Sequence, residues 1–89
     1  MQEDDKIRAT LLYQLRRKNI IGKKHTSFDN LKKGFPTHLG KDINKIAKNL
    51  IKEDWIITKP TSYGLEVSLN HSKIKEIENY ILKSLNLSF

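Results

Sequence analysis

The sequence predicts a single α+β domain with a three-helix core, a small antiparallel hairpin and a closing helix. A chain of 89 residues has room for one hydrophobic core. In the segments 4–19, 37–53 and 71–86, apolar residues recur at the three- and four-residue spacing of amphipathic helices. Before the last of these segments, the pattern changes to two extended runs separated by Pro and Gly, which is typical of a β-hairpin.

The first third of the chain is predicted to form a helix, a short strand and a second helix, in that order. The helix over residues 4–19 ends in arginine and lysine, which are favourable at the negative end of the helix dipole. Residues 25–27 are expected to be extended. The pair Thr26 and Asp29 matches a capping box, which predicts a short helix over residues 28–33.

The middle of the chain is expected to hold a third helix and the hairpin. A tight turn at Gly34-Phe35-Pro36 precedes the helix over residues 37–53, with Thr37 as its predicted N-cap. The hairpin spans residues 55–69 and the closing helix residues 71–86. This order of elements is that of the winged helix-turn-helix fold, in which the hairpin, with two or three strands, is the wing.

The third helix carries the most informative pattern, because it has two opposite faces. Its apolar face consists of Leu39, Ile43, Ile46, Ala47 and Leu50. The other face is basic: it carries Lys41, Lys45, Lys48 and Lys52 and no acidic residue. Lysines four residues apart repel one another, and a polyanion along this face would offset the repulsion by releasing its counterions. The alternative is a solvated face, although such faces usually mix both signs of charge.

In a winged helix bound to DNA, the third helix enters the major groove and its N-terminal half meets base edges. The residues that this half offers are Thr37, His38, Lys41, Asn44, Lys45 and Lys48. The amide of Asn44 can bond both N6 and N7 of adenine, and the alternative is that it faces water. Lys48 and Lys52, farther along the helix, are expected to contact phosphates.

Further DNA contacts are expected on either side of this helix. Lys32 and Lys33 end the second helix beside the turn, where backbone phosphates often lie. In the hairpin, Lys59 and Thr61 are candidates for backbone contact. Tyr63 would stack or donate its hydroxyl to a phosphate, unless its ring folds onto the hairpin.

Composition excludes several other classes of function. The net charge of +7 favours an anionic partner, and the absence of cysteine excludes disulfides, thiolate zinc sites and cysteine nucleophiles. His25, His38 and His71 are far apart without carboxylates at ligand spacing, so we expect neither a metal site nor a cofactor. No catalytic triad or Gly-rich phosphate loop can be built, and we expect no enzyme activity.

The chain is also expected to be cytoplasmic. Its start, MQEDDK, is acidic where a signal peptide is basic, and no apolar run approaches the length that spans a bilayer.

Four segments resemble those of a family of small archaeal winged-helix proteins without a settled role. These segments are His25-Thr26-Ser27, Gly34-Phe35-Pro36-Thr37-His38, Lys59-Pro60-Thr61-Ser62-Tyr63-Gly64 and Val67-Ser68-Leu69-Asn70. The resemblance implies the winged-helix fold and an archaeal source, and it adds little about function.

The closing helix has more apolar surface than one buried stripe needs. Its stripe consists of Ile74, Ile77, Ile81 and Leu85, and the surplus residues are Tyr80, Leu82, Leu87 and Phe89. Surplus apolar surface often marks an interface, which predicts a homodimer paired through this helix.

Together, the order of elements and the basic third helix make a double-stranded DNA-binding transcriptional regulator the leading hypothesis. The alternatives are a protein-interaction module in a nucleic-acid-processing assembly and an RNA-binding protein.

Overall fold

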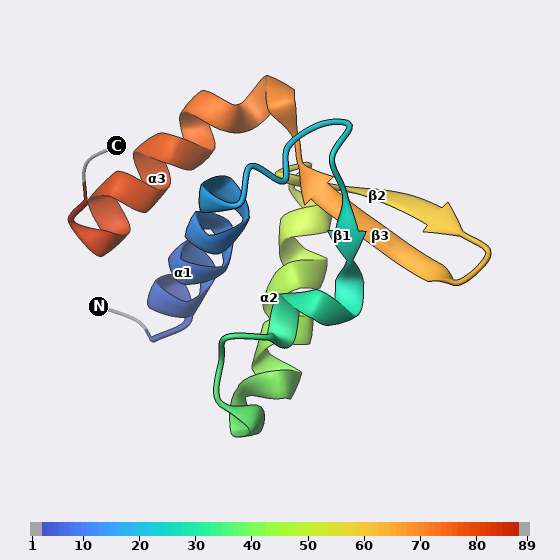
Figure 1. Ribbon diagram of the computed structural model, residues 1–89. Helices are drawn as coiled ribbons and strands as arrows, with labels where there is room; N and C mark the ends of the chain where they lie inside the picture. Colours follow the sequence, from blue (N-terminus) through green and yellow to red (C-terminus); the bar gives the residue numbers. More distant parts are fainter. Residues whose placement is uncertain (1–2, 88–89) are drawn as a thin grey trace.

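The computed structural model describes residues 3–87 and confirms the α+β class (Figure 1). Its three α-helices are α1 (Glu3–Arg17), α2 (Gly40–Lys52) and α3 (Ile74–Leu85). Its three strands are β1 (Thr26–Ser27), β2 (Ile56–Thr61) and β3 (Gly64–Leu69). Its short 3-10 helices are η1 (Phe28–Lys32), η2 (Thr37–Leu39) and η3 (His71–Lys73). The order of elements along the chain is the predicted one.

The strands form one antiparallel sheet in the order β1-β3-β2. Thr61 pairs with Gly64 across a two-residue turn, and Gly64 has a φ of +136°, a backbone conformation that side-chain-bearing residues rarely adopt. Thr26 pairs with Val67 on the other edge of β3. The sheet is thus three-stranded, as the sequence allowed, because β1 adds to the β2–β3 hairpin. The tip of the hairpin projects away from the helices (Figure 1).

The core lies between the three helices and the inner face of the sheet. Its largest fully buried apolar side chains come from the three α-helices and two strands: Leu11, Leu12, Ile43, Leu50, Ile56, Val67, Leu69, Ile77 and Ile81. The helix α1 packs against both α2 and α3, while α2 also contacts η1 and β2. The predicted apolar stripe of residues 37–53 therefore faces the centre of the molecule.

Two predicted helices differ from those observed. The second is a 3-10 helix over Phe28–Lys32, and its end is closed by an i→i+3 hydrogen bond from Lys33 N–H to the Asn30 carbonyl over 3.1 Å. The first ends at Arg17 instead of residue 19, because Asn19 takes a left-handed φ of +59° and Ile20 N–H then donates to the Leu15 carbonyl over 2.9 Å. The third and fourth helices begin as the 3-10 turns η2 and η3 before continuing as α2 and α3.

Both predicted capping residues were wrong. Ser27, not Thr26, caps η1, and its hydroxyl accepts from the Asp29 N–H over 3.2 Å. Thr37 lies inside η2, whose N-cap is Pro36 with no side-chain hydrogen bond. Pro36 has a φ of −57° and a ψ of 144°, so the backbone is extended there and turns helical only at Thr37.

Candidate nucleic-acid interface

The basic face of α2 is exposed along its whole length. Lys41, Lys45, Lys48 and Lys52 are all exposed, directly opposite the buried stripe of the same helix. Among residues 3–87, no carboxylate forms an ion pair with any of the four. The positive charge of this row is therefore not neutralised within the described part of the chain, and it is available to an anionic partner.

The two flanks of the lysine row differ in charge. Asn44 and Ile51 lie on one flank, where both are half-buried. Asp42 and Asn49 lie exposed on the other flank, beside Glu53 at the end of the helix. The Asn44 amide is thus at the edge of the row rather than at its centre, so a base would meet it only from the uncharged flank.

The basic surface continues from α2 onto the preceding turn. A Cβ atom on Gly40 would lie 3.7 Å from Lys32 Cδ, so the Lys32 side chain runs against the first turn of α2. An open groove of about 280 Å³ lies here, lined by Lys32, Lys33, Phe35, Pro36, Thr37, Gly40 and Ile43. His38 is exposed next to this groove. The structure therefore brings the turn residues and the lysine row onto one continuous surface.

The hairpin presents only part of its predicted set. Lys59 is exposed, and Tyr63 at the tip is 90% exposed, which rules out the alternative that its ring folds onto the hairpin. The Thr61 hydroxyl donates to the Gly64 carbonyl over 2.7 Å. Because its hydrogen closes the turn, this hydroxyl has only acceptor capacity left and is a poor phosphate donor.

The surplus apolar surface expected on the closing helix is mostly absent. Tyr80 is half-buried, packs on the core and donates its hydroxyl to the Asp5 carbonyl over 3.2 Å. Leu82 is half-buried, Leu87 is 40% exposed, and Phe89 lies outside the described residues. The outward face of α3 is instead polar, with exposed Lys75, Glu76, Asn79 and Lys83. The homodimer stays a prediction, with Leu87 as its main exposed apolar residue within residues 3–87.

A side-chain cluster centred on Arg8 holds the end of α2 in place, and no spacing in the sequence predicts it, because Arg8 and Glu53 are 45 positions apart. The guanidinium of Arg8 forms two hydrogen bonds to the Glu53 carboxylate, one of them Nη1 to Oε2 at 3.0 Å. Its Cζ also lies 5.1 Å from the ring centre of Trp55 and 5.2 Å from that of Tyr80. These contacts join α1, the end of α2, the start of β2 and α3, and they fix the orientation of the lysine row.

The Arg8–Glu53 pair predicts a specific loss of stability in acid. The hydrogen bond from Arg8 lowers the pKa of Glu53 below its usual value near 4.5. A carboxyl with a lowered folded-state pKa stabilises the protein above its unfolded-state pKa, and this contribution disappears as the pH falls through the folded-state pKa. Because the Glu53 side chain is 45% exposed, we expect a contribution of at most about 1 kcal/mol.

Urea denaturation of the wild type and Glu53→Gln across pH 3 to 7 measures this contribution directly. We expect the wild type to be more stable at neutral pH, with the difference shrinking below about pH 4.5. The matched control is Glu76→Gln, which replaces an exposed carboxyl on α3. Its free energy of unfolding should stay close to that of the wild type at every pH. A constant difference between wild type and Glu53→Gln at all pH values would contradict this account.

Among residues 3–87, no cluster of three or more His, Asp or Glu side chains is arranged to hold a metal ion. Within the same residues, each helix is too short or too polar to cross a bilayer.

Comparisons with protein-family models, with curated proteins and with solved structures found no match to this chain.

Proposed function

We propose that the protein is a winged helix-turn-helix that binds double-stranded DNA, most simply as a small transcriptional regulator. In this proposal α2 is the recognition helix in the major groove, and the β2–β3 hairpin is the wing beside it. The observation that carries the proposal is the exposed, acid-free and unpaired lysine row on α2, continuous with Lys32 and Lys33.

The surface chemistry favours duplex DNA over RNA. An α-helix with a straight basic face fits the major groove of B-form DNA, whereas the corresponding groove of A-form RNA is too narrow to admit one. Single-stranded nucleic acid is usually bound by several exposed aromatic rings, and Tyr63 is the one exposed Phe, Tyr or Trp ring within residues 3–87. The shape of the basic helix and the scarcity of exposed Phe, Tyr and Trp rings in the described part of the chain both favour double-stranded DNA as the partner.

A second candidate function is docking to a protein partner through the hairpin. Ile57 and Leu65, each 37% exposed, and Tyr63 place apolar side chains on β2, β3 and the turn between them. They form most of the large apolar exposure within residues 3–87. A protein partner would be favoured over DNA if substitutions in the hairpin abolished formation of a complex with that partner and substitutions in α2 left the complex intact.

A salt titration of duplex binding tests the proposed function. If about five lysines contact phosphates, log K should fall against log salt concentration with a slope of roughly −4 to −5. Fluorescence anisotropy with a labelled duplex of random sequence measures this slope, and a single strand and an RNA duplex of the same length serve as comparisons. Absence of duplex binding at low salt, or tighter binding to RNA, would overturn the proposal.

A further inference from the structure

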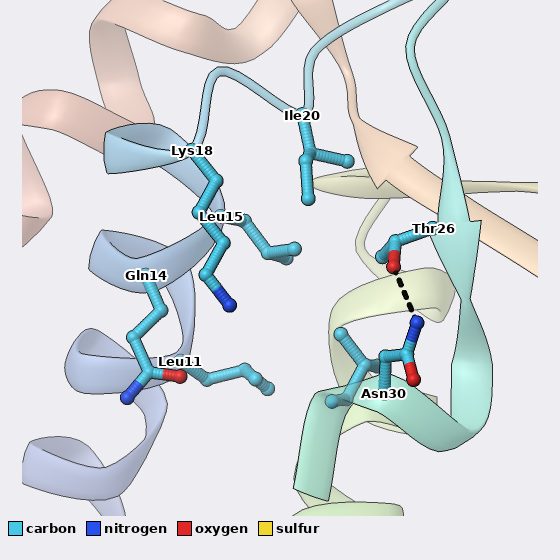
Figure 2. A pocket seen from close by; sticks show the side chains of 8 residues that line it. Leu11, Gln14, Leu15, Lys18, Ile20, Thr26 and Asn30 are labelled. Atoms are coloured by element: carbon cyan, nitrogen blue, oxygen red, sulfur yellow. Dashed lines mark hydrogen bonds between the residues drawn. The ribbon is translucent and has the colours of Figure 1, made fainter. Parts of the chain in front are cut away.

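A small cleft separates the C-terminal half of α1 from β1 and η1 (Figure 2). Its apolar floor consists of Leu11, Leu15, Ile20 and Leu31, each no more than 7% exposed. The space that a water-sized group can occupy in this cleft measures about 20 Å³, and all the space between its side chains, open solvent included, is about 270 Å³. The cleft therefore admits a group of one or two heavy atoms at its floor and a larger polar group at its mouth.

Four polar side chains surround the mouth of this cleft: Gln14, Lys18, Thr26 and Asn30. Figure 2 shows the Lys18 side chain descending from the end of α1, with its ammonium directed into the space that Thr26 and Asn30 border from the other side. Among residues 3–87, the ammonium of Lys18 has no hydrogen-bond or ion-pair partner. No carboxylate lines the cleft.

The hydrogen bonds within the mouth leave donors free. Asn30 Nδ2 donates to Thr26 Oγ1 over 2.9 Å, so the Thr26 oxygen serves as acceptor and its hydrogen stays available. Asn30 Nδ2 retains its second hydrogen, and Lys18 offers three. One cation and neutral donors that line the same cleft without a competing acid match a small anion, because charge-assisted hydrogen bonds are the strongest available to it.

We propose that this cleft binds a short-chain aliphatic carboxylate. The carboxylate would accept hydrogen bonds from Lys18, Thr26 and Asn30, and its short aliphatic end would rest on the leucine floor. The apolar floor favours an organic acid over an inorganic anion, because inorganic phosphate would leave its polar oxygens facing leucine without partners. The occupiable space of about 20 Å³ limits the tail to about two carbons. This proposal does not depend on DNA binding.

Propionate is the probe, and the full-length protein is small enough for a two-dimensional NMR titration. We expect saturable shifts of the Thr26 and Asn30 amides and of the floor leucine methyl groups. A ligand of about five heavy atoms should bind in the millimolar range. Propionamide, the uncharged analogue of the same shape, should bind about tenfold more weakly, because it loses the charge-assisted hydrogen bond.

Two variants with a matched control locate the binding groups. Lys18→Gln and Thr26→Val should each weaken propionate binding by about tenfold, since each removes one donor. Lys23→Gln removes an exposed lysine from the neighbouring loop outside the cleft and should change nothing. Because Lys18 is exposed, its replacement should leave the fold intact even if Thr26→Val disturbs β1.

Several results would overturn the proposal. Shifts that grow linearly without saturation, or equal binding of propionamide, would mean that the cleft holds only water or a nonspecific solute. Saturation by phosphate without a response to propionate would assign the cleft to inorganic anions. Equal weakening by Lys23→Gln would indicate general charge attraction instead of this site.

Discussion

Reversing two charges in the centre of the α2 row, Lys45→Glu with Lys48→Glu, should lower duplex DNA affinity by about 100-fold at 0.1 M salt. Each phosphate contact contributes about 0.9 to the salt exponent, so at this salt concentration the loss of one contact lowers the binding constant roughly eightfold. Two lost contacts lower it about 60-fold, and repulsion by the introduced carboxylates adds to this. Anisotropy titrations against one duplex measure the change.

The matched control places the same charge change on the polar face of α3. Lys75→Glu with Lys83→Glu also lowers the net charge by four, from +7 to +3, and both positions are exposed. If α2 is the DNA-binding surface, this control should lose far less affinity than the α2 variant. Equal losses in the two variants would show that only net charge matters and would remove α2 from its proposed role.

The apolar side of the same helix should determine stability. Leu50 is fully buried in the core, so Leu50→Ala removes a buried isopropyl group and leaves a cavity. Substitutions of this kind typically cost about 3 kcal/mol, which is a large part of the unfolding free energy of a small domain. Urea denaturation followed by the fluorescence of Trp55, the single tryptophan, measures the loss.

Leu87→Ala is the control for this measurement. Leu87 is 40% exposed beyond the end of α3, and truncation there should change stability by less than about 0.5 kcal/mol. A small effect of Leu50→Ala, similar to that of Leu87→Ala, would contradict the packing of α2 described above. A large effect of Leu87→Ala would instead show that this side chain is covered in solution, as the predicted homodimer requires.

The sequence alone determined the class of the fold and the two faces of α2. Both follow from periodicity, which is local: Ile43, Ile46 and Leu50 must share a face on any helix, and Lys41, Lys45 and Lys48 must share the opposite one. The hairpin was also predictable, because its apolar and polar residues alternate around a turn that contains Pro and Gly. The ends and caps of the helices were not predictable in this way. A left-handed backbone at Asn19 ends the first helix, and the Ser27 hydroxyl, not that of Thr26, caps η1.

Only the tertiary structure decided which side chains are free for a partner. Arg8 and Glu53 are 45 positions apart, so no spacing rule connects them, and the fold is needed to place Arg8 on Trp55 and Tyr80. The same packing half-buries Tyr80, which the sequence had placed in the surplus apolar surface of the closing helix. The cleft below Lys18 likewise forms only where α1 meets η1, because its two walls come from segments that are brought together by burial of the core and not by local sequence.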